Sequence, residues 1–469
     1  MKAVIVIPPL PKGVLRESVC VSPPLNAPYL AASLREAGHS VSIVDAPPHR
    51  LNAKGVAEEV AARRPDFVGI TSLTQTYPSS LEVAAEIRRA VPEVPIATGG
   101  PHATFCADET FLRSPITIVI RGEGEQTIVD VANRLEAGED LSGVQGVTYR
   151  TPSGQIIAND DRPFIADLDS LPFPAYDLLP LNLYGVLGGR KIFLLQSSRG
   201  CPYGCSFCVM YRMDGKHFRA RSAKSVSDEI ELLKGLKADS FSFCDDIFTL
   251  DKKRVGALCD EIISRGLDVP WDCQTRADAL DDGVLERMKR AGCQLMCIGV
   301  ESGSQEILDR MHKRTTVDQN IEAIRKIQAA GIAASSSIII GYPGETRESF
   351  TDSINFVKKA KPDIAFLNIA TPFPGTPLFD EIFPNGLQEP SDWQKFDVTT
   401  PVFETPTMSK AELSAARREF YNSWYSVGYV LRNLRKRNFY NRTMAWFALT
   451  YIRWRLANRA KDAIFRSFR

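Results

Sequence analysis

Residues 199–208 read Arg-Gly-Cys-Pro-Tyr-Gly-Cys-Ser-Phe-Cys, and the rest of the chain is interpreted outward from this stretch. Gly200, Pro202 and Gly204 keep the backbone between the cysteines out of regular structure, so the loop can bend until three thiolates converge. Thiolate sulfur suits iron–sulfur clusters, and three ligands leave one iron of a four-iron cluster open for a further molecule. The cysteines have a C-x3-C-x2-C spacing and are Cys201, Cys205 and Cys208.

A structural zinc site, or a set of buried thiols, is the alternative interpretation of this triplet. Structural zinc sites are usually built from paired C-x2-C units that close to four ligands. No second pair of cysteines or histidines follows the triplet at the expected distance, and His217 is the only nearby candidate for a fourth ligand. The spacing therefore favours a cluster over zinc.

The composition is that of a globular protein with more than one domain. At 469 residues the chain is too long for one ordinary core, so we expect two or three domains. Hydrophobic residues make up 44% and charged residues 24%, and no run of about 18 apolar residues predicts a membrane-spanning helix. Residues 1–10 are typical of a first strand and not of a signal peptide. Ten cysteines without a disulfide framework favour a reducing compartment, so we expect a cytoplasmic protein.

Apolar strands and amphipathic helices alternate over residues 1–140, the expected first domain. This alternation predicts an α/β fold with a doubly wound parallel sheet of the Rossmann or flavodoxin type. Ligands of such folds bind at the carboxyl ends of the strands, which here carry small and polar residues. The expected strands are residues 3–7, 41–44, 67–70, 95–97 and 116–120, and the segments that follow them include 45–47, 71–74, 99–102 and 121–125.

A connector is expected over residues 141–190. Two short strands, 144–149 and 155–158, flank Pro-Ser-Gly and predict a hairpin. The proline-rich segment 168–177 that follows is interpreted as an extended linker.

A second alternation of strands and helices occupies residues 191–385. Six strand–helix units predict a partial (β/α)6 barrel of the TIM type, with the chemistry at the carboxyl ends of its strands. The cysteine triplet follows the first of these strands. Single carboxylates at Glu345 and Asp363 are interpreted as helix caps or surface ion pairs. The expected strands are residues 192–196, 240–244, 270–275, 294–300, 334–340 and 364–370.

The last region, residues 386–469, is expected to be helical, basic and rich in aromatic residues. From Lys410 to the end it contains 14 Lys and Arg against 3 Asp and Glu, a net charge of +11, which leaves −10 for the preceding residues. Three interpretations remain: a helix packed on the barrel with a solvated basic face, an interfacial helix on anionic lipid, or a nucleic-acid-binding helix. The third is the least favoured.

The cysteine triplet, with aromatic Phe207 before its last cysteine, resembles the radical S-adenosylmethionine (SAM) enzymes. The resemblance implies that the three cysteines bind a [4Fe-4S] cluster and that SAM occupies its open iron. It also implies SAM contacts at the strand ends: Asp245 and Asp246 for the methionyl amino group, and Arg276 for the carboxylate. The remaining implied contacts are Phe207 beside the cluster, Glu301 and Ser302 for the ribose, and Gly341, Pro343 and Gly344 on the adenine side.

The first domain resembles the cobalamin (B12)-binding domain that is often fused to a radical SAM core. Domains of this kind that ligate cobalt from below carry D-x-H-x-x-G after the second strand. Here Asp45 is followed by His49 at the wrong spacing and without the glycine, so His49 is interpreted as an exposed loop histidine. The implied cobalamin contacts are Thr71, Ser72, Leu73, Gly99, Gly100, His102, Gly122 and Glu123, with His102 expected to line the site and not to ligate cobalt.

The resemblance implies a class B, cobalamin-dependent radical SAM enzyme. Such an enzyme generates a 5′-deoxyadenosyl radical and methylates an unactivated carbon of a small-molecule, natural-product or lipid substrate, with electrons from a flavodoxin or ferredoxin type of donor. An oxidative cyclase or ring-rearranging enzyme with the same cofactors is the first alternative. A non-catalytic corrinoid-binding protein is a further alternative, but it gives no reason for the triplet. Methylthiolation of tRNA would need three more cysteines before the triplet, and only Cys20 and Cys106 precede it.

Overall fold

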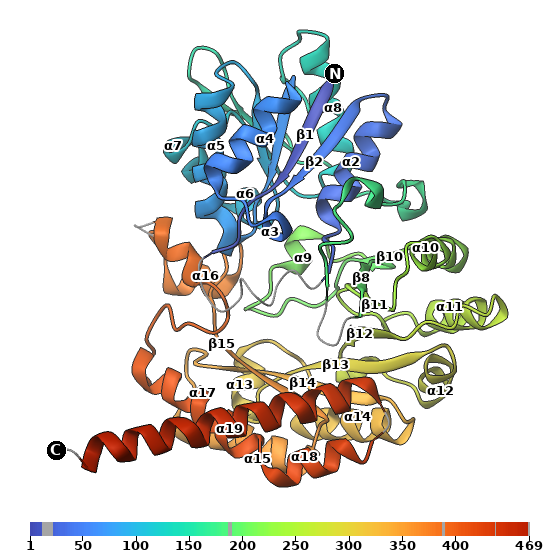
Figure 1. Cartoon of the computed structure of the whole chain (residues 1–469), viewed down its shortest axis with the longest axis vertical. Helices are drawn as coiled ribbons and strands as arrows, with labels where there is room; N and C mark the ends of the chain where they lie inside the picture. Colours follow the sequence, from blue (N-terminus) through green and yellow to red (C-terminus); the bar gives the residue numbers. More distant parts are fainter. Residues whose placement is uncertain (12–21, 186–189, 387–389, 437, 468–469) are drawn as a thin grey trace. The chain divides into compact units, whose positions relative to one another are not determined.

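The computed structural model describes residues 1–11, 22–185, 190–386, 390–436 and 438–467, with side chains to Leu456 in the last helix. These residues form two compact units. Figure 1 traces the chain through both, from the N-terminus in blue to the C-terminus in red. The first unit contains residues 1–246 and 371–397, and the second contains residues 247–370 and 398–469. Whether the boundaries expected from the sequence, at 140, 190 and 385, separate independent folding domains stays a prediction.

The N-terminal sheet has seven strands in the order β2-β1-β3-β4-β5-β6-β7. The five parallel strands, β1 to β5, confirm the predicted doubly wound sheet. The hairpin expected in the connector also forms, but it extends this sheet, because β6 pairs antiparallel with β5. The strands are β1 Lys2–Ile7, β2 Ser40–Asp45, β3 Phe67–Thr71, β4 Ile96–Gly99, β5 Ile118–Ile120, β6 Val147–Arg150 and β7 Ile156–Ala158.

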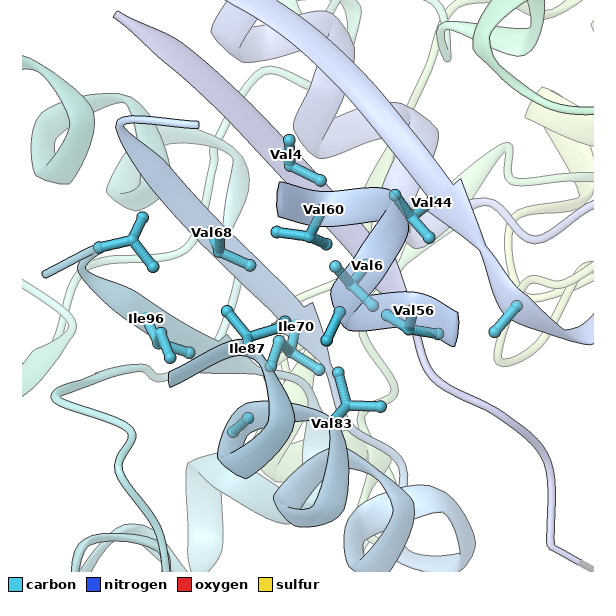
Figure 2. Close-up of a cluster of buried hydrophobic side chains, with 14 of the residues drawn as sticks. Val4, Val6, Val44, Val56, Val60, Val68, Ile70, Val83, Ile87 and Ile96 are labelled. Carbon is cyan, nitrogen blue, oxygen red and sulfur yellow. The ribbon is translucent and has the colours of Figure 1, made fainter. Parts of the chain in front are cut away.

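The core of this sheet is made of β-branched residues, which pack well on a pleated surface (Figure 2). Val6, Val68 and Ile70 of the strands meet Val56 and Val83 of helices α4 and α5, and all five are at most 2% exposed. Strands buried in this way read as continuous apolar runs, which is why the sequence predicted a parallel sheet. The helices of this part are α2 Asn26–Glu36, α3 Ala46–His49, α4 Ala53–Arg63, α5 Tyr77–Ala90, α6 Pro101–Phe105, α7 Ala107–Arg113 and α8 Glu125–Glu136.

The first unit also contains the start of the partial barrel. Strand β8 pairs in parallel with β11, and the short strands β9 and β10 pair antiparallel on either side of the cysteine loop. These elements are β8 Ile192–Leu195, β9 Ser198–Arg199, α9 Met210–Met213, β10 Arg219–Ala220, α10 Ala223–Gly235, β11 Ser240–Phe243 and α16 Pro377–Ile382.

The second unit contains the four remaining parallel strands of the predicted six, in the order β15-β14-β13-β12. Helices alternate with them along the chain, so the prediction of a partial (β/α)6 barrel is confirmed. The elements are α11 Lys252–Ser264, β12 Trp271–Thr275, α12 Asp282–Arg290, β13 Cys293–Glu301, α13 Gln305–Arg310, α14 Val317–Ala329, β14 Ala333–Ile340, α15 Arg347–Ala360 and β15 Ile364–Ile369.

The region after residue 386 was predicted to be helical, and its described residues form the helices α17 Lys410–Trp424, α18 Val427–Leu434 and α19 Phe439–Ser467. Two tyrosines, one buried and one half-buried, join them to the rest of the second unit. Tyr429 donates a hydrogen bond to the carbonyl of Asp363 at 2.8 Å, and Tyr440 donates one to Asp272 at 2.6 Å. Across the described ranges, no helix is both long and apolar enough to cross a bilayer.

One glycine of the N-terminal sheet should tolerate no side chain. Gly100, after β4, has φ 117° and ψ 179°, and a Cβ there would lie 2.4 Å from the carbonyl oxygen of Ser72. This backbone conformation costs other residues about 1–3 kcal/mol, before the clash. Gly100→Ala should therefore lower the free energy of unfolding in urea by at least this amount. The control is Gly235→Ala, where a Cβ would meet no described atom within 4 Å. Equal unfolding midpoints for the two variants would contradict the expectation that a side chain at position 100 strains the backbone.

Candidate functional site

The cysteine loop begins at the end of β9 in a conformation that only glycine fits. Gly200 has φ 96°, and a Cβ there would lie 2.2 Å from the carbonyl oxygen of His217. The amide of Cys201 then donates to the carbonyl of Gly215 at 3.0 Å, which fixes the direction in which the loop leaves the strand. The two ends of the loop are thus held together before any metal is bound.

One thiol of this loop has a strongly shifted pKa. Burial, with the nearby Cys205, Asp246 and Cys201 as further causes, raises the pKa of the Cys208 thiol to about 12, so a thiolate there needs a positively charged partner. Phe207 lies half-buried in the same loop.

The two aspartates after β11 have different surroundings. Asp245 accepts hydrogen bonds from the amide and hydroxyl of Ser197, at 2.7 and 2.6 Å, and from the hydroxyl of Ser198 at 2.6 Å. It therefore fixes the turn between β8 and β9. Asp246 has one buried carboxylate oxygen without a hydrogen-bond partner in the described part of the chain. Burial, then Asp214 and Asp245, raises the pKa of Asp246 to about 7. Of the two, Asp246 is the one available to a ligand.

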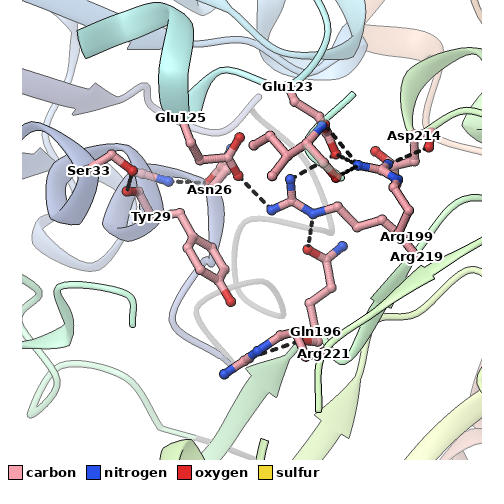
Figure 3. A network of polar contacts seen from close by, with 12 residues as sticks. Asn26, Tyr29, Ser33, Glu123, Glu125, Gln196, Arg199, Asp214, Arg219 and Arg221 are labelled. Carbon is pink, nitrogen blue, oxygen red and sulfur yellow. Dashed lines mark hydrogen bonds and ion pairs between the residues drawn. The ribbon is translucent and has the colours of Figure 1, made fainter. Parts of the chain in front are cut away.

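A buried ion network joins the cysteine loop to the loop after β5 (Figure 3). Arg199 contacts Glu123 at 3.0 Å and Glu125 at 2.6 Å, and Arg219 contacts Glu123 at 2.9 Å. Every side chain in these pairs is at most 9% exposed. The amide of Ile165 donates to the other oxygen of Glu123 at 2.6 Å. The carboxylate of Glu123, predicted as a cobalamin contact, is thus already occupied by the protein.

One cavity of about 470 Å³ lies between the strand ends of the N-terminal sheet and the flanks of the cysteine loop. The sheet side includes six of the eight residues predicted to contact cobalamin. The opposite side includes Asp214, which follows the cysteine loop, and Cys244, which follows β11, while helix α2 contributes Tyr29 and Leu30. The six residues from the sheet are Thr71, Leu73, Gly99, Gly100, Gly122 and Glu123.

Glycines form part of the cavity wall at the strand ends. A Cβ at Gly69 would lie 3.1 Å from the Ile5 side chain, and one at Gly124 would lie 3.0 Å from Leu30. A backbone wall of this kind lets a ligand approach closely. Ser72 is buried behind this wall, with a hydroxyl that has no partner among the described residues.

Two histidines predicted near this edge are placed differently from each other. His49 is exposed and its Nδ1 lies 2.9 Å from the carbonyl oxygen of Asp45, which agrees with a surface position. His102 was expected to line the ligand site, but it is fully buried and is absent from the cavity wall. Its ring packs between Tyr77 and Trp393, with ring centroids 3.9 and 4.7 Å away.

Sequence reasoning missed several cavity residues. Arg199 could have been noticed, because a basic residue directly before a cluster motif is a plausible anchor. Tyr29, Leu30 and Asp214 give no signal in the sequence, since they become part of the cavity only through the packing of α2 and the turn before β10.

The SAM contacts predicted in the second unit fall into two groups. In the first, Arg276 donates to the carbonyl of Lys313 at 2.7 Å, and the Lys313 ammonium lies 2.8 Å from Glu301. Glu301 has φ 67°, a left-handed conformation rare for a non-glycine residue. Ser302 is fully buried and accepts from the amide of Ser304 at 3.1 Å. The partner that sequence reasoning missed here is Lys313.

The second group is the loop Gly341 to Gly344, after β14. Gly341 has φ 78°, and a Cβ there would lie 2.7 Å from Leu413 of α17, so this C-terminal helix covers the loop. The amide of Gly341 donates to the carboxylate of Glu345. Pro343, the remaining predicted contact, lies between these glycines.

Glu345 and Asp363 were interpreted as helix caps or surface ion pairs, but both are buried and neither caps a helix, so that interpretation was wrong. Glu345 is 0% exposed, and burial raises its pKa to about 7. Asp363 is 1% exposed and pairs with Lys436, while Asn441 donates to it at 2.8 Å. Both carboxylates are covered because the C-terminal helices pack over this end of the second unit.

Two family models match the chain in the regions just described. Residues 11–132 match the B12 binding domain, and residues 195–357 match the radical SAM superfamily. An uncharacterized methyltransferase of Pyrococcus horikoshii is 35% identical over 429 residues, which are 91% of this chain and 92% of that protein. The chain belongs to the B12-binding radical SAM family. The predicted family and the prediction of an enzyme are thereby confirmed, and the expected cofactors are those of the two matched domains.

Two further proteins are similar to this radical SAM enzyme, one in sequence and one in structure. The anaerobic magnesium-protoporphyrin IX monomethyl ester cyclase of Rubrivivax gelatinosus is 31% identical over 423 residues, covering 85% of this chain and 74% of that protein. The solved structure of the radical SAM methyltransferase TsrM from Kitasatospora setae has a TM-score of 0.73 at 18% identity, covering 89% of this chain and 90% of that one. The structural similarity to TsrM establishes the fold.

Removing Arg199 should disrupt the cysteine loop, because Glu123 and Glu125 would keep buried charges with one cation fewer. Breaking a buried ion pair by removing one partner costs about 3–5 kcal/mol. We expect Arg199→Met to lower the free energy of unfolding by this amount and to change the EPR spectrum of the reconstituted, reduced cluster.

The matched control is Arg35→Met, which breaks the exposed pair with Asp177 and should cost less than about 1 kcal/mol. If the Arg199 variant were as stable as this control and its cluster spectrum unchanged, the network would not position the loop.

Proposed function

We propose that the enzyme is a cobalamin-dependent radical SAM C-methyltransferase. Cys201, Cys205 and Cys208 would hold the [4Fe-4S] cluster. The glycine-rich strand ends of the N-terminal sheet would hold cobalamin, and the strand ends of the barrel would hold SAM. When bound, the cluster and SAM supply a radical able to abstract hydrogen from carbon, and cobalamin supplies the methyl group.

The observation that carries this proposal is the shared cavity. Its walls come from the strand ends of the B12-binding sheet on one side and from the flanks of the cysteine loop on the other. A protein that only carried a corrinoid, without using it in a reaction, would not need the strand ends and the cysteine loop to line the same cavity. Binding both cofactors at one cavity allows a reaction that uses them in sequence.

The chain's own residues position the cofactors and exclude water. Asp246 offers the SAM ammonium a carboxylate that is already buried, so the pair would form in a low-dielectric site where the attraction is strong. Arg276 and Lys313 lie at the strand end at which the SAM carboxylate is expected, and each is held there by a carboxylate, Arg276 by Asp278 at 3.0 Å and Lys313 by Glu301 at 2.8 Å. The side chains of Leu30, Leu194 and Ile128 make the cavity wall apolar, which protects reactive species from solvent.

A cyclase is the second candidate function, because the relative from Rubrivivax gelatinosus carries that name at 31% identity. It would use the same residues to bind the same cofactors. The two functions differ in whether carbon from the methyl group of SAM enters the product.

The test is anaerobic turnover with SAM labelled in its methyl group, after reconstitution of cluster and cobalamin, in a soluble extract and separately in a lipid extract with a flavodoxin or ferredoxin type of donor. We expect a labelled product that is one methyl group heavier than its substrate. The Cys205→Ala chain should show no SAM cleavage and no label transfer. An unlabelled product of altered mass would favour the cyclase, and SAM cleavage that survived Cys205→Ala would contradict the cluster assignment.

We also propose that the C-terminal helices bind the surface of an anionic membrane. Helix α18 exposes Val427, Leu431 and Leu434, at i, i+4 and i+7, by 53% or more. Helix α19 exposes Trp446 and Trp454, each by 61%. Exposed apolar residues at this spacing, on a tail with a net charge of +11, have the composition of interfacial helices.

Vesicle sedimentation tests this surface. Trp446→Ser combined with Trp454→Ser should weaken binding to phosphatidylglycerol-containing vesicles about tenfold or more, since the two indoles carry much of the buried apolar area. The control is Leu112→Ser, which removes an 80% exposed leucine from α7. Equal sedimentation of the two variants, or equal binding to purely zwitterionic vesicles, would contradict the proposal.

A further inference from the structure

His102 is an unusual residue in the first unit. It is 0% exposed, and neither ring nitrogen has a hydrogen-bond partner among the described residues. A buried polar group without a partner costs about 1–3 kcal/mol. The aromatic rings of Tyr77 and Trp393 enclose the imidazole but offer no acceptor to it. Such a nitrogen calls for a partner that the protein chain itself does not supply.

Two further metal-ligand side chains lie next to this imidazole. His102 is in helix α6, Cys106 is the residue between helices α6 and α7, and Glu109 is in the first turn of α7. One ligand atom from each of the three lies within 4.8 Å of the other two. In the described part of the chain, this is the one set of three such residues that meets this distance.

The neighbours of Glu109 leave it able to bind an ion. The indole of Trp393 donates to one oxygen of its carboxylate at 3.2 Å, and Arg113 lies 3.4 Å from the same oxygen. These contacts orient the carboxylate, as outer-sphere partners of metal ligands do. The second oxygen is engaged by neither of them.

We propose that His102, Cys106 and Glu109 bind one divalent transition-metal ion of the zinc class. Imidazole, thiolate and carboxylate together match the ligand preference of Zn²⁺, whereas Ca²⁺ and Mg²⁺ take oxygen ligands. Cys106 and Glu109 also line a second cavity of about 450 Å³. Water from this cavity can supply the fourth ligand of a tetrahedral ion.

This site is distinct from those of the cluster and cobalamin. The wall of the 470 Å³ cavity contains none of the three ligands. The inference therefore does not depend on the proposed function. A bound ion would join α6, which starts directly after Gly100, to α7, and through Trp393 it would fix the segment 390–395 against both helices.

Zinc binding to the full-length chain, loaded with cluster and cobalamin, tests the proposal. The wild type should bind one Zn²⁺ per chain after removal of loosely held metal, measured by elemental analysis and by competition with a chromophoric chelator. Cys106→Ser and Glu109→Gln should each weaken zinc about 100-fold, since each removes one of three protein ligands. Zinc should raise the melting temperature of the wild type and not that of these variants.

Three controls decide the outcome. Asp108→Asn changes the exposed carboxylate next to Glu109 and should leave zinc affinity unchanged. A chain with all three cluster cysteines changed to alanine should still bind the ion, which excludes zinc lodged in the cluster loop. Gln at position 109 keeps an acceptor for Trp393, so this variant should fold even where Cys106→Ser does not. Equal zinc content in Glu109→Gln and wild type, or loss of zinc with the cluster cysteines, would overturn the proposal.

Discussion

Arg199 carries a buried positive charge, and two carboxylates from the loop after β5 neutralise it. An isolated charge of this kind could not remain in the interior, because the cost of removing it from water exceeds what a domain can offset. The charge is satisfied only when the loop after β5 and the end of β9 lie together. Gly200 and Cys201 follow Arg199 directly. The ion pairs therefore determine where the cysteine loop starts relative to the N-terminal sheet.

The proposed arrangement of cofactors follows from this constraint. The carboxyl ends of the parallel strands form the ligand-binding edge of the sheet, as in other doubly wound folds. With the cysteine loop anchored beside that edge, one cavity receives walls from both. Gly100 and Gly200 then allow backbone conformations and close contacts that no other residue permits. The site is thus built from backbone geometry and buried charge, with few polar side chains left for ligands.

Local patterns predicted most of the fold, while long-range contacts were out of reach. The apolar strands and the cysteine spacing are local; the strands were predicted correctly, and the spacing indicated the family that the comparisons confirm. Arg199 and Glu123 lie 76 residues apart, and nothing in either segment names the other as its partner. Glu345 and Asp363 are buried by the C-terminal helices, which are distant from them in the sequence. The residues next to each carboxylate in the sequence therefore did not indicate this burial. Likewise the hairpin after residue 140 was predicted, but not its pairing with the free edge of β5.

The central claim is that cobalamin binds in the cavity beside the loop that holds the [4Fe-4S] cluster. EPR spectroscopy of the anaerobic enzyme tests it directly, with cobalamin reduced to its Co(II) state and the cluster reduced to its paramagnetic state in the same sample. If the claim is right, the two spins interact, and the spectrum differs from the sum of spectra recorded with each cofactor present separately. A spectrum equal to that sum, with both cofactors fully bound, would contradict the account.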